Sequence, residues 1–259
     1  MPESIKTVST VSEVKQWREL IAANSRVGFV PTMGSLHAGH RSLVERAVAE
    51  NDKVIVSVFV NPTQFNNNSD YVSYPSQVEK DKALLEEWGA SCVWLPAREE
   101  LYADQYRYRV RENELALVLE GASRPGHFDG VLTVVLKLLL IVSPHSAYFG
   151  EKDYQQLLLV RGMVESLFLN TKVIACPVIR TKMGLALSSR HARLSDNDLQ
   201  LANRLYPILC EAKSAEKATE MLKLQGFEVD YVVDQWQRRL AAVTVGGVRL
   251  IDNIPLSVG

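Results

Sequence analysis

Two histidines beside a glycine turn are the residues of this chain whose types and spacing best suit chemistry. His37 and His40 stand three residues apart, after a short apolar run and a turn at Gly34. An amphipathic helix is predicted over residues 41–50. A strand, a glycine turn and a helix start present backbone N–H groups to a phosphate, and imidazoles there can stabilise charge on a polyphosphate. Gly39 would let a phosphate approach the backbone closely.

The same pair of histidines is also compatible with an accident of a surface helix, because a short motif by itself is only a hypothesis. The order of strand, turn and helix favours a nucleotide site. Residues 53–60 are short and β-branched, which predicts a buried parallel strand. In a right-handed βαβ unit, ligands bind at the carboxyl ends of the strands. We therefore expect the histidine turn and the following residues 61–65 to face one crevice.

Two further junctions carry polar groups at predicted strand ends. Residues 147–149 predict a strand that runs into Lys152 and Asp153, and Gln156 lies on the same helical face as Asp153. Lys152 could meet a phosphate or be an ordinary surface lysine. After a predicted strand at residues 172–179, a small-residue loop contains Ser188, Ser189 and Arg190. Their hydroxyls, amides and guanidinium suit a triphosphate, and they equally suit a capped loop before a helix.

The remaining elements are predicted from periodicity and turn residues. Residues 91–95 are predicted to form a third strand, and a helix is predicted over 11–23 with Ser12 as its candidate cap. The other predicted elements are helices over 77–88, 112–119, 131–142, 196–212 and 216–224, β-rich stretches over 228–233 and 243–251, a polar and mobile segment over 66–74, and a loop over 121–130 that carries Arg124 and His127.

Composition narrows the class of protein. The 259 residues are 47% hydrophobic and 23% charged, with a formal net charge of −1. Such a chain is typical of a globular enzyme or binding protein, and the charge argues against recruitment of nucleic acid or an anionic membrane. Three widely spaced cysteines without a Cys-x-x-Cys pair argue against a disulfide framework or a structural zinc site. No apolar run reaches bilayer length and no signal core is evident, so we expect a cytoplasmic protein.

Six blocks together resemble the pantothenate synthetase (pantoate–β-alanine ligase) family of AMP-forming ligases. They extend from near residue 27 to the C-terminus in the order of the family. The matching blocks are 31–40 (PTMGSLHAGH), 59–65 (FVNPTQF), 124–131 (RPGHFDGV), 149–156 (FGEKDYQQ), 185–190 (LALSSR) and 249–254 (RLIDNI).

The resemblance implies a two-step reaction. The carboxylate of pantoate attacks the α-phosphorus of ATP to give pantoyl adenylate and pyrophosphate, and the amine of β-alanine then displaces AMP. His40 would be a proton donor, and the implied catalytic groups are His40, His37, Lys152 and Arg190. The implied ATP contacts are Met33, Gly34, His37, His40, Gly150, Lys152, Asp153, Ile179, Leu187, Ser188, Ser189 and Arg190. The implied substrate contacts are Gln64, Gln156 and Asn61, with Gln64 near β-alanine.

The resemblance also implies an α/β fold with a Rossmann-like parallel sheet of the nucleotidyltransferase type. Residues 1–178 would bind ATP and pantoate, and residues 179–259 would form a smaller α+β lid domain. A homodimer is implied, with no nucleic acid or membrane partner. Mg²⁺ should accompany ATP, held mostly by phosphates and water. Asp81 is a weak candidate for a protein ligand.

The chain departs from the family at a few positions. Residues 180–186 read RTKMGLA, where the family has acids at the positions of Thr181 and Met183, and His191 stands where the family prefers Asn. These changes bear on loop packing and ATP affinity. Two rival functions remain open: a nucleotidyltransferase acting on a phosphorylated small molecule, and an ATP-binding regulator or RNA-binding relative of class I synthetases without turnover.

Overall fold

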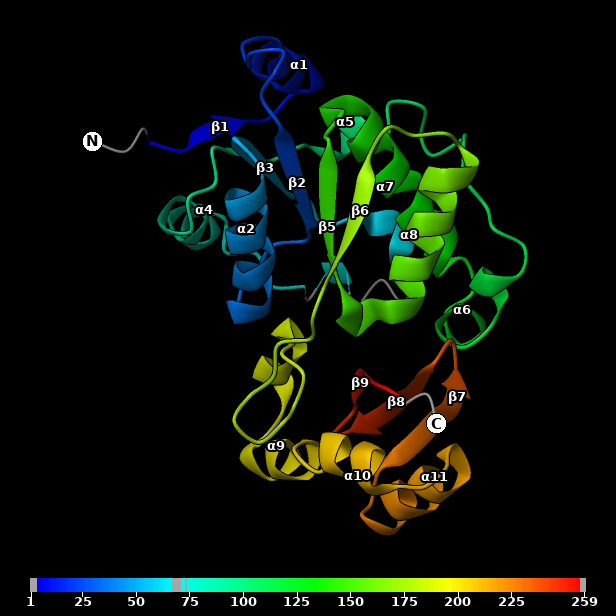
Figure 1. Cartoon of the computed structure of the whole chain (residues 1–259). Helices are drawn as coiled ribbons and strands as arrows, with labels where there is room; N and C mark the ends of the chain where they lie inside the picture. Colours follow the sequence, from blue (N-terminus) through cyan, green and yellow to red (C-terminus); the bar gives the residue numbers. More distant parts are fainter. Residues whose placement is uncertain (1–3, 67–70, 73, 257–259) are drawn as a thin grey trace. The chain divides into compact units, whose positions relative to one another are not determined.

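The computed structural model describes residues 4–66, 71–72 and 74–256. Most of the segment 66–74, predicted above to be polar and mobile, lies outside the described residues. The chain divides into two compact units, coloured along the sequence in Figure 1. Unit 1 contains Met1–Leu36, His40–Gly150 and Gln155–Cys176, and unit 2 contains His37–Gly39, Glu151–Tyr154 and Pro177–Gly259.

Unit 1 is built on a six-stranded parallel sheet in the order β1-β4-β3-β2-β5-β6. This confirms the predicted α/β fold with a parallel sheet. The inner strands are short and almost wholly buried, as expected for a sheet covered on both faces. The strands are β1 (Lys6–Val8), β2 (Val27–Thr32), β3 (Lys53–Val58), β4 (Cys92–Trp94), β5 (Ser146–Gly150) and β6 (Lys172–Cys176).

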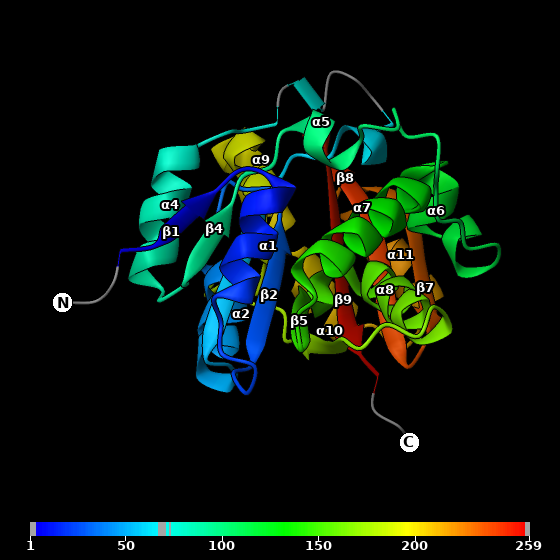
Figure 2. The same ribbon diagram turned by 90° about the horizontal axis from the view of Figure 1, so that it is seen from above.

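Helices cover the two faces of this sheet. Right-handed crossovers place α2 and α4 on one face and α1, α7 and α8 on the other. In both views α7 and α8 lie side by side (Figures 1 and 2). The helices and 3₁₀ turns that precede β6 in the chain are α1 (Val11–Glu19), α2 (Ala38–Glu50), η1 (Pro62–Gln64), α4 (Val78–Glu87), α5 (Arg98–Leu101), η2 (Leu115–Leu117), α6 (Glu120–Ser123), α7 (His127–Val142), η3 (Glu151–Asp153) and α8 (Tyr154–Ser166). The first residues of α2 and α8 and the whole of η3 are assigned to unit 2.

Unit 2 contains a three-stranded antiparallel sheet with helices packed against it. The sheet has the order β7-β8-β9, and its core joins the apolar faces of α10 and α11 to the inner face of the strands. The two hairpin turns, Trp236-Gln237 and Gly246-Gly247, have positive φ at both residues, as type I′ turns require. The elements are η4 (Ser189–Arg193), α9 (Asp196–Ala202), α10 (Leu205–Glu211), α11 (Ala215–Leu224), β7 (Glu228–Gln235), β8 (Arg238–Val245) and β9 (Val248–Pro255).

Several predicted elements of unit 1 are wrong in detail. Thr10, and not Ser12, caps α1 through a capping box with Glu13. The predicted helix over 112–119 is only the short η2, because the Glu112 carboxylate accepts from two backbone N–H groups of its own segment. The predicted loop over 121–130 contains α6 and the start of α7, which begins at His127. The strand β1 was not predicted.

In unit 2, two predicted elements are divided. The helix predicted over 196–212 is broken into α9 and α10. Pro207 lacks an N–H, and starting a new helix at Leu205 places it in a first turn, where no bond is lost. The strand predicted over 243–251 crosses the Gly246-Gly247 turn and is two strands. In unit 1, the strand predicted over 172–179 is shorter than expected and ends at Cys176, directly before Pro177.

Candidate active site

The carboxyl ends of β2 and β5 bring together two of the predicted nucleotide turns. In the sheet, β3, β4 and β1 lie on one side of β2, whereas β5 and β6 lie on its other side. Ligands of open α/β sheets bind at such a switch point. Met33 and Gly34 directly follow β2, and Gly150 is the last residue of β5. These three predicted contacts therefore stand at neighbouring strand ends of unit 1.

Asp81 shapes the turn that follows β2. Its buried carboxylate accepts hydrogen bonds from the backbone N–H groups of Ser35 and Leu36, at 2.8 Å and 2.9 Å. Gly34 and Ser35 have φ of 80° and 53°, and a Cβ on Gly34 would lie 2.9 Å from Asp81 Oδ2. The carboxylate suggested above as a weak Mg²⁺ ligand is thus engaged by the backbone, and its role here is to hold the turn.

His40 lies in the first turn of α2 in unit 1. Its side chain is half-buried. The first turn of α2 contains no acidic residue, so the positive end of the helix dipole is not neutralised by its own side chains. The helix starts at Ala38, earlier than the predicted residue 41, and this places His40 inside the helix.

His37 precedes α2 and clusters with unit 2. Its ring Nδ1 accepts from the backbone N–H of Gly39 at 3.1 Å, so the neutral ring carries its proton on Nε2. Burial, followed by the charges of Lys152 and His191, lowers the pKa of His37 from 6.5 to about 4. A Cβ on Gly39 would lie 2.8 Å from the ring. The result at neutral pH is an uncharged imidazole with an N–H donor beside a lysine.

Lys152 belongs to a short segment, Glu151–Tyr154, that we call the Lys152 segment. Asn253 on β9 donates from Nδ2 to the carbonyl oxygens of Glu151 and Lys152, at 2.9 Å and 3.0 Å. Arg238 on β8 donates to Glu151 Oε2 and to Asn253 Oδ1, both at 2.7 Å. The Arg238 guanidinium also lies 4.3 Å from the centre of the Tyr154 ring. The backbone that carries Lys152 and Asp153 is therefore held from two strands.

The loop that carries Ser188, Ser189 and Arg190 is organised within unit 2. Leu187 N donates to the carbonyl of Ile179 at 2.9 Å, and Ser188 caps the 3₁₀ turn by accepting from Arg190 N. His191, one of the departures from the family pattern, is half-buried, and burial together with the charge of Lys152 lowers its pKa. The structure thus pairs Ile179 with Leu187 and brings His191 into the electrostatic environment of His37 and Lys152.

Arg180 begins the segment in which the family acids are replaced. Its guanidinium forms a bidentate ion pair with Asp252, at 2.6 Å and 2.9 Å, and stacks 3.9 Å from the centre of the Tyr206 ring. Burial raises the pKa of Asp252, and the neighbouring Arg180 opposes that rise. Thr181 closes the following turn by accepting from Leu185 N through its hydroxyl, whereas the Met183 side chain is exposed. The two positions that depart from the family, Thr181 and Met183, therefore lie in a turn that is closed by the hydrogen bond from Leu185 to Thr181.

Gln64 lies at the end of η1 in unit 1, in a segment that we call the Gln64 loop (residues 61–66). Its side chain accepts from Asn61 Nδ2 at 3.0 Å and donates to Met33 Sδ at 3.2 Å. Asn61 is 1% exposed, and its Oδ1 accepts from Thr63 and from the Tyr102 hydroxyl. Asn61 thus orients the Gln64 side chain through this hydrogen bond. A contact of Asn61 with substrate stays a prediction.

The start of α7 supports the Gln64 loop. His127 Nδ1 lies 2.8 Å from the carbonyl oxygen of Gln64, and Arg124 donates to the same oxygen at 3.3 Å. A Cβ on Gly130 would lie 2.5 Å from the Thr63 carbonyl oxygen, so only glycine allows this approach of helix and loop. Arg124 and His127, which the sequence analysis noted, therefore hold the Gln64 loop through the carbonyl oxygen of Gln64.

The neighbouring glutamines of α8 have different environments. Gln155 is buried, accepts from Glu120 N and donates to the carbonyls of Leu115 and Val118. Gln156 is half-buried, and within the described part of the chain its side-chain amide has no hydrogen-bond partner. The structure therefore separates a structural amide from one whose donor and acceptor remain for a ligand.

Sequence reasoning missed the groups that position the predicted contacts. Asp81 was considered only as a metal ligand, and Gly130 was given no role. Asn253 lies in the block 249–254, so its motif was a signal, but no function was attached to it. Arg238 stands between the two β-rich stretches that were predicted, and no local pattern marked it.

Two features of the described residues bear on membrane and metal partners. None of the helices in residues 4–66, 71–72 and 74–256 combines the length and apolarity needed to cross a bilayer. Within the same ranges, no three His, Cys, Asp or Glu side chains are grouped so as to ligate a metal ion. The expectation that Mg²⁺ accompanies ATP stays a prediction.

The parallel sheet, its switch point and the polar turns define an α/β protein of the nucleotide-binding type. A family model described as pantoate-beta-alanine ligase matches residues 6–255. The chain is 49% identical over 252 residues to a pantothenate synthetase of Coxiella burnetii, covering 97% of each chain. It is 46% identical over 245 residues to one of Bdellovibrio bacteriovorus, covering 95% of this chain and 97% of the relative.

Solved structures agree with these matches. A pantoate-beta-alanine ligase from Francisella tularensis, complexed with β-γ ATP and β-alanine, superposes with a TM-score of 0.93 at 42% identity, covering 98% of this chain and 99% of the other. A pantothenate synthetase from Thermus thermophilus gives a TM-score of 0.90 at 42% identity, covering 97% and 99%. The chain belongs to the pantoate-beta-alanine ligase family.

Proposed function

We propose that this chain joins pantoate to β-alanine through a pantoyl-adenylate intermediate, with release of pyrophosphate and AMP. Membership of the family supports the overall reaction, and the Francisella tularensis relative was solved with an ATP analogue and β-alanine. The observation that supports the adenylation step is the half-buried His37, whose pKa is lowered by burial and by the charge of Lys152 so that its ring is neutral, in unit 2. An uncharged N–H donor and a fixed cation suit a polyphosphate whose negative charge grows during the reaction.

The proposed nucleotide contacts follow from the family resemblance, and those of each unit are given by themselves. In unit 1, Met33 and Gly34 would lie along the nucleotide, Gly150 would contact the ribose, and His40 would bind phosphate and donate a proton. The remaining proposed contacts belong to unit 2. They are His37, Lys152, Ser188, Ser189 and Arg190 for the triphosphate, Asp153 for the ribose, and the backbone at Ile179 and Leu187 for the adenine end.

Pantoate would be bound by the amides of unit 1. Gln64 and Gln156 offer donors and acceptors without a formal charge, so they can bind a carboxylate and hydroxyl groups without neutralising the nucleophile. The contacts of Asn61 with Thr63, Tyr102 and Gln64 support a positioning role for it. Gln64 would also lie near the incoming amine of β-alanine.

The proposed two-step reaction requires the protein to position the reactants and to stabilise negative charge. In the first step a carboxylate oxygen attacks the α-phosphorus and the bond to pyrophosphate breaks, so donors and cations must meet the leaving oxygens. In the second step the β-alanine amine attacks the acyl carbon, and AMP leaves with the former carboxylate oxygen. Mg²⁺ would neutralise phosphate charge when it is bound, held by phosphates and water.

Three further expectations remain proposals. Residues 179–259 would act as a lid, the chain would form a homodimer, and Mg²⁺ would be required. Sedimentation tests the homodimer, because the measured mass should be that of two chains and not that of one. Dependence of turnover on added Mg²⁺, after treatment with a chelator, tests the third.

Pyrophosphate release tests the proposed function. The assay contains ATP and Mg²⁺ with or without pantoate and β-alanine, for the wild type and for His40→Ala. Release that needs pantoate, produces AMP when β-alanine is added, and collapses in the variant is the expected result. Release that is indifferent to pantoate contradicts the proposal. In that case phosphorylated small molecules should be screened, as for a nucleotidyltransferase.

A further inference from the structure

The buried side chain of Gln155, in the first turn of α8, holds the chain on both sides of Leu119 in unit 1. Its Nε2 donates to the carbonyl oxygen of Val118 at 2.8 Å, and its Oε1 accepts from the backbone N–H of Glu120 at 3.1 Å. These two groups belong to the peptide units before and after Leu119. Nε2 also donates to the carbonyl oxygen of Leu115 at 2.8 Å. One amide thus satisfies three backbone groups of one short segment.

The backbone that Gln155 holds is strained. Leu119 has φ of 48° and ψ of −115°, although it is not a glycine, and it is the residue that caps the start of α6. Such a conformation costs free energy and persists where the surroundings require it. A Cβ on Gly121 would overlap the carbonyl oxygen of Ala116, so the chain also approaches itself closely here. The Gln155 amide therefore helps to set the path by which the chain enters α6.

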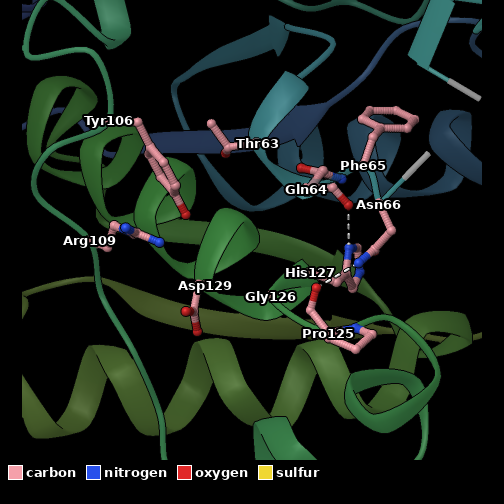
Figure 3. A pocket seen from close by; sticks show the side chains of 10 residues that line it. All are labelled: Thr63, Gln64, Phe65, Asn66, Tyr106, Arg109, Pro125, Gly126, His127 and Asp129. Carbon is pink, nitrogen blue, oxygen red and sulfur yellow. Dashed lines mark hydrogen bonds between the residues drawn. The ribbon is translucent and has the colours of Figure 1, made fainter. Parts of the chain in front are cut away.

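The chain that leaves α6 holds the Gln64 loop. His127 Nδ1 lies 2.8 Å from the carbonyl oxygen of Gln64 (Figure 3). A carbonyl oxygen only accepts, so Nδ1 carries the proton, and Nε2 accepts from Arg124 Nη1 at 3.1 Å. Asn66 Nδ2 donates to the carbonyl oxygen of Pro125 at 2.6 Å. The placement of α6 thus sets the placement of the groups that support this loop.

Gln155 is also the neighbour of Gln156 on α8. The Gln156 side chain is half-buried, and its amide has no hydrogen-bond partner within the described part of the chain. Because successive helical residues are related by a fixed rotation, a side chain that is buried and bonded three times fixes the direction of its neighbour. Gln155 therefore acts on Gln156 through the helix and on Gln64 through α6.

We propose that Gln155 is a positioning residue that sets the two substrate glutamines, Gln64 and Gln156, relative to each other. This role rests on the proposed function, in which both amides bind pantoate. A rigid substrate site needs its contacts at a fixed separation, so a shift of either amide should weaken pantoate binding. Lys152 is held separately by Asn253, so ATP binding should not depend on Gln155.

The first test of this role does not depend on turnover. The nucleotide-free protein is labelled with ¹⁵N in its glutamine side chains, and the signals of Gln64 and Gln156 are assigned from their loss in Gln64→Asn and Gln156→Asn. Gln155→Met keeps a side chain of similar length and removes all three hydrogen bonds. We expect the side-chain N–H signals of both Gln64 and Gln156 to shift in this variant.

The control is Asn51→Leu, which removes a structural amide elsewhere in unit 1. Asn51 donates to the carbonyl oxygen of Ala47 at 2.8 Å and to the Tyr148 hydroxyl at 2.7 Å. Its loss should destabilise the protein without shifting the two glutamine signals. Signals that stay in place in Gln155→Met, or that shift equally in the control, overturn the proposed role.

Kinetics then separate positioning from a general loss of stability. In pantoate-dependent pyrophosphate release, Gln155→Met should raise the KM for pantoate about tenfold and leave the KM for ATP unchanged. The rise should be smaller when the same change is made in Gln64→Asn or in Gln156→Asn, because part of what Gln155 positions is then already lost. An undiminished rise in either background would show that Gln155 does not act through that glutamine, and it would overturn the link.

A second variant covers a failure of Gln155→Met to fold. Gln155→Glu keeps the acceptor for the N–H of Glu120 and loses both donated hydrogen bonds, and the same shifts and KM changes are expected for it. If the wild type releases no pyrophosphate in response to pantoate, the proposed function fails, whatever the NMR signals show. If release is normal and neither the signals nor the KM for pantoate changes in the variant, the role given to Gln155 is wrong.

Discussion

The Gln64 loop of unit 1 and the Lys152 segment of unit 2 are held in place by different physics. The Gln64 loop is fixed by neutral hydrogen bonds through the buried Asn61 and by the close approach of Gly130 to Thr63. The Lys152 segment is fixed by Asn253 and by the charged Arg238–Glu151 pair. Packing thus positions the proposed substrate amides, and a charged network positions the proposed phosphate cation.

The two regions should therefore tolerate different kinds of change. A region fixed mainly by close packing and neutral hydrogen bonds should respond to added volume and less to pH or salt, because its charged contact, from Arg124 to the Gln64 carbonyl, is long at 3.3 Å. A region fixed by buried and half-buried charges should respond to loss of one partner and to protonation.

Arg180→Leu should cause the largest loss of stability, and it acts in unit 2. Asp252 has a fully buried side chain, so removing Arg180 leaves an uncompensated buried carboxylate. We expect the free energy of unfolding to fall by about 3–5 kcal/mol in urea titrations. Adding Asp252→Asn removes the orphaned charge and should restore part of the loss. A double variant no more stable than the single one would show that the charge is not the cause.

Gly130→Ala tests the packed region. The new methyl group would meet the backbone of Thr63 and Gln64, which cannot move aside as a side chain could. We expect a loss of about 1–3 kcal/mol in stability, together with a raised KM for pantoate. The control is Gly162→Ala on α8, where nothing lies within 4 Å of the added methyl group. If both variants behave alike, close packing does not position the Gln64 loop.

Asn253→Ala tests how the Lys152 segment is held. The loss of two hydrogen bonds to its carbonyls should let Lys152 move, and we expect the KM for ATP to rise about tenfold. The KM for pantoate should not change, whereas a general loss of structure would raise the KM for both substrates. The control is Arg249→Gln, which removes an exposed ion pair with Asp230 from the same sheet. Equal rises in the KM values for ATP and pantoate would argue against a positioning role.

The pH dependence of stability should distinguish His37. Its pKa of about 4, with burial as the main cause, lies below the 6.5 of the unfolded chain. The unfolded chain therefore binds a proton that the folded chain does not, and stability is lost as pH falls from 6.5 towards 4. His37→Gln lacks this titration, while His191, Lys152 and Asp153 remain.

The expected size of this effect is small. Between about pH 7 and about pH 5, the wild type should lose on the order of 1 kcal/mol more than His37→Gln, after allowance for partial exposure of the ring. Urea titrations at each pH measure the difference. Parallel curves for the two proteins would show that His37 is not held in its neutral form by folding.

Part of this structure could be predicted because its signals are local. The strand, turn and helix around His37 and His40 are contiguous, and the β-branched run of residues 53–60 is short enough to indicate a buried strand. Local patterns failed where a side chain competed with the helix, as at Glu112, and where Pro207 and Gly246 divided elements that looked continuous.

The groups that position the site could not be predicted from local pattern. Asn253 reaches the Lys152 segment across about a hundred residues of sequence, and Gly130 meets Thr63 across more than sixty. Periodicity describes which face of an element is buried and not which distant backbone that face meets. The predicted roles of the contact residues follow from family resemblance, and the variants above are needed to test them.

The most direct test of the account is the fate of the pantoate carboxylate oxygens. Pantoate labelled with ¹⁸O in its carboxylate is converted with ATP and β-alanine, and the products are analysed by mass spectrometry. If the chain forms pantoyl adenylate, each AMP molecule carries one ¹⁸O from the carboxylate, and the amide keeps the other. AMP without label, or label in inorganic phosphate, would contradict adenylation of pantoate and with it the central role given to His37, His40 and Lys152.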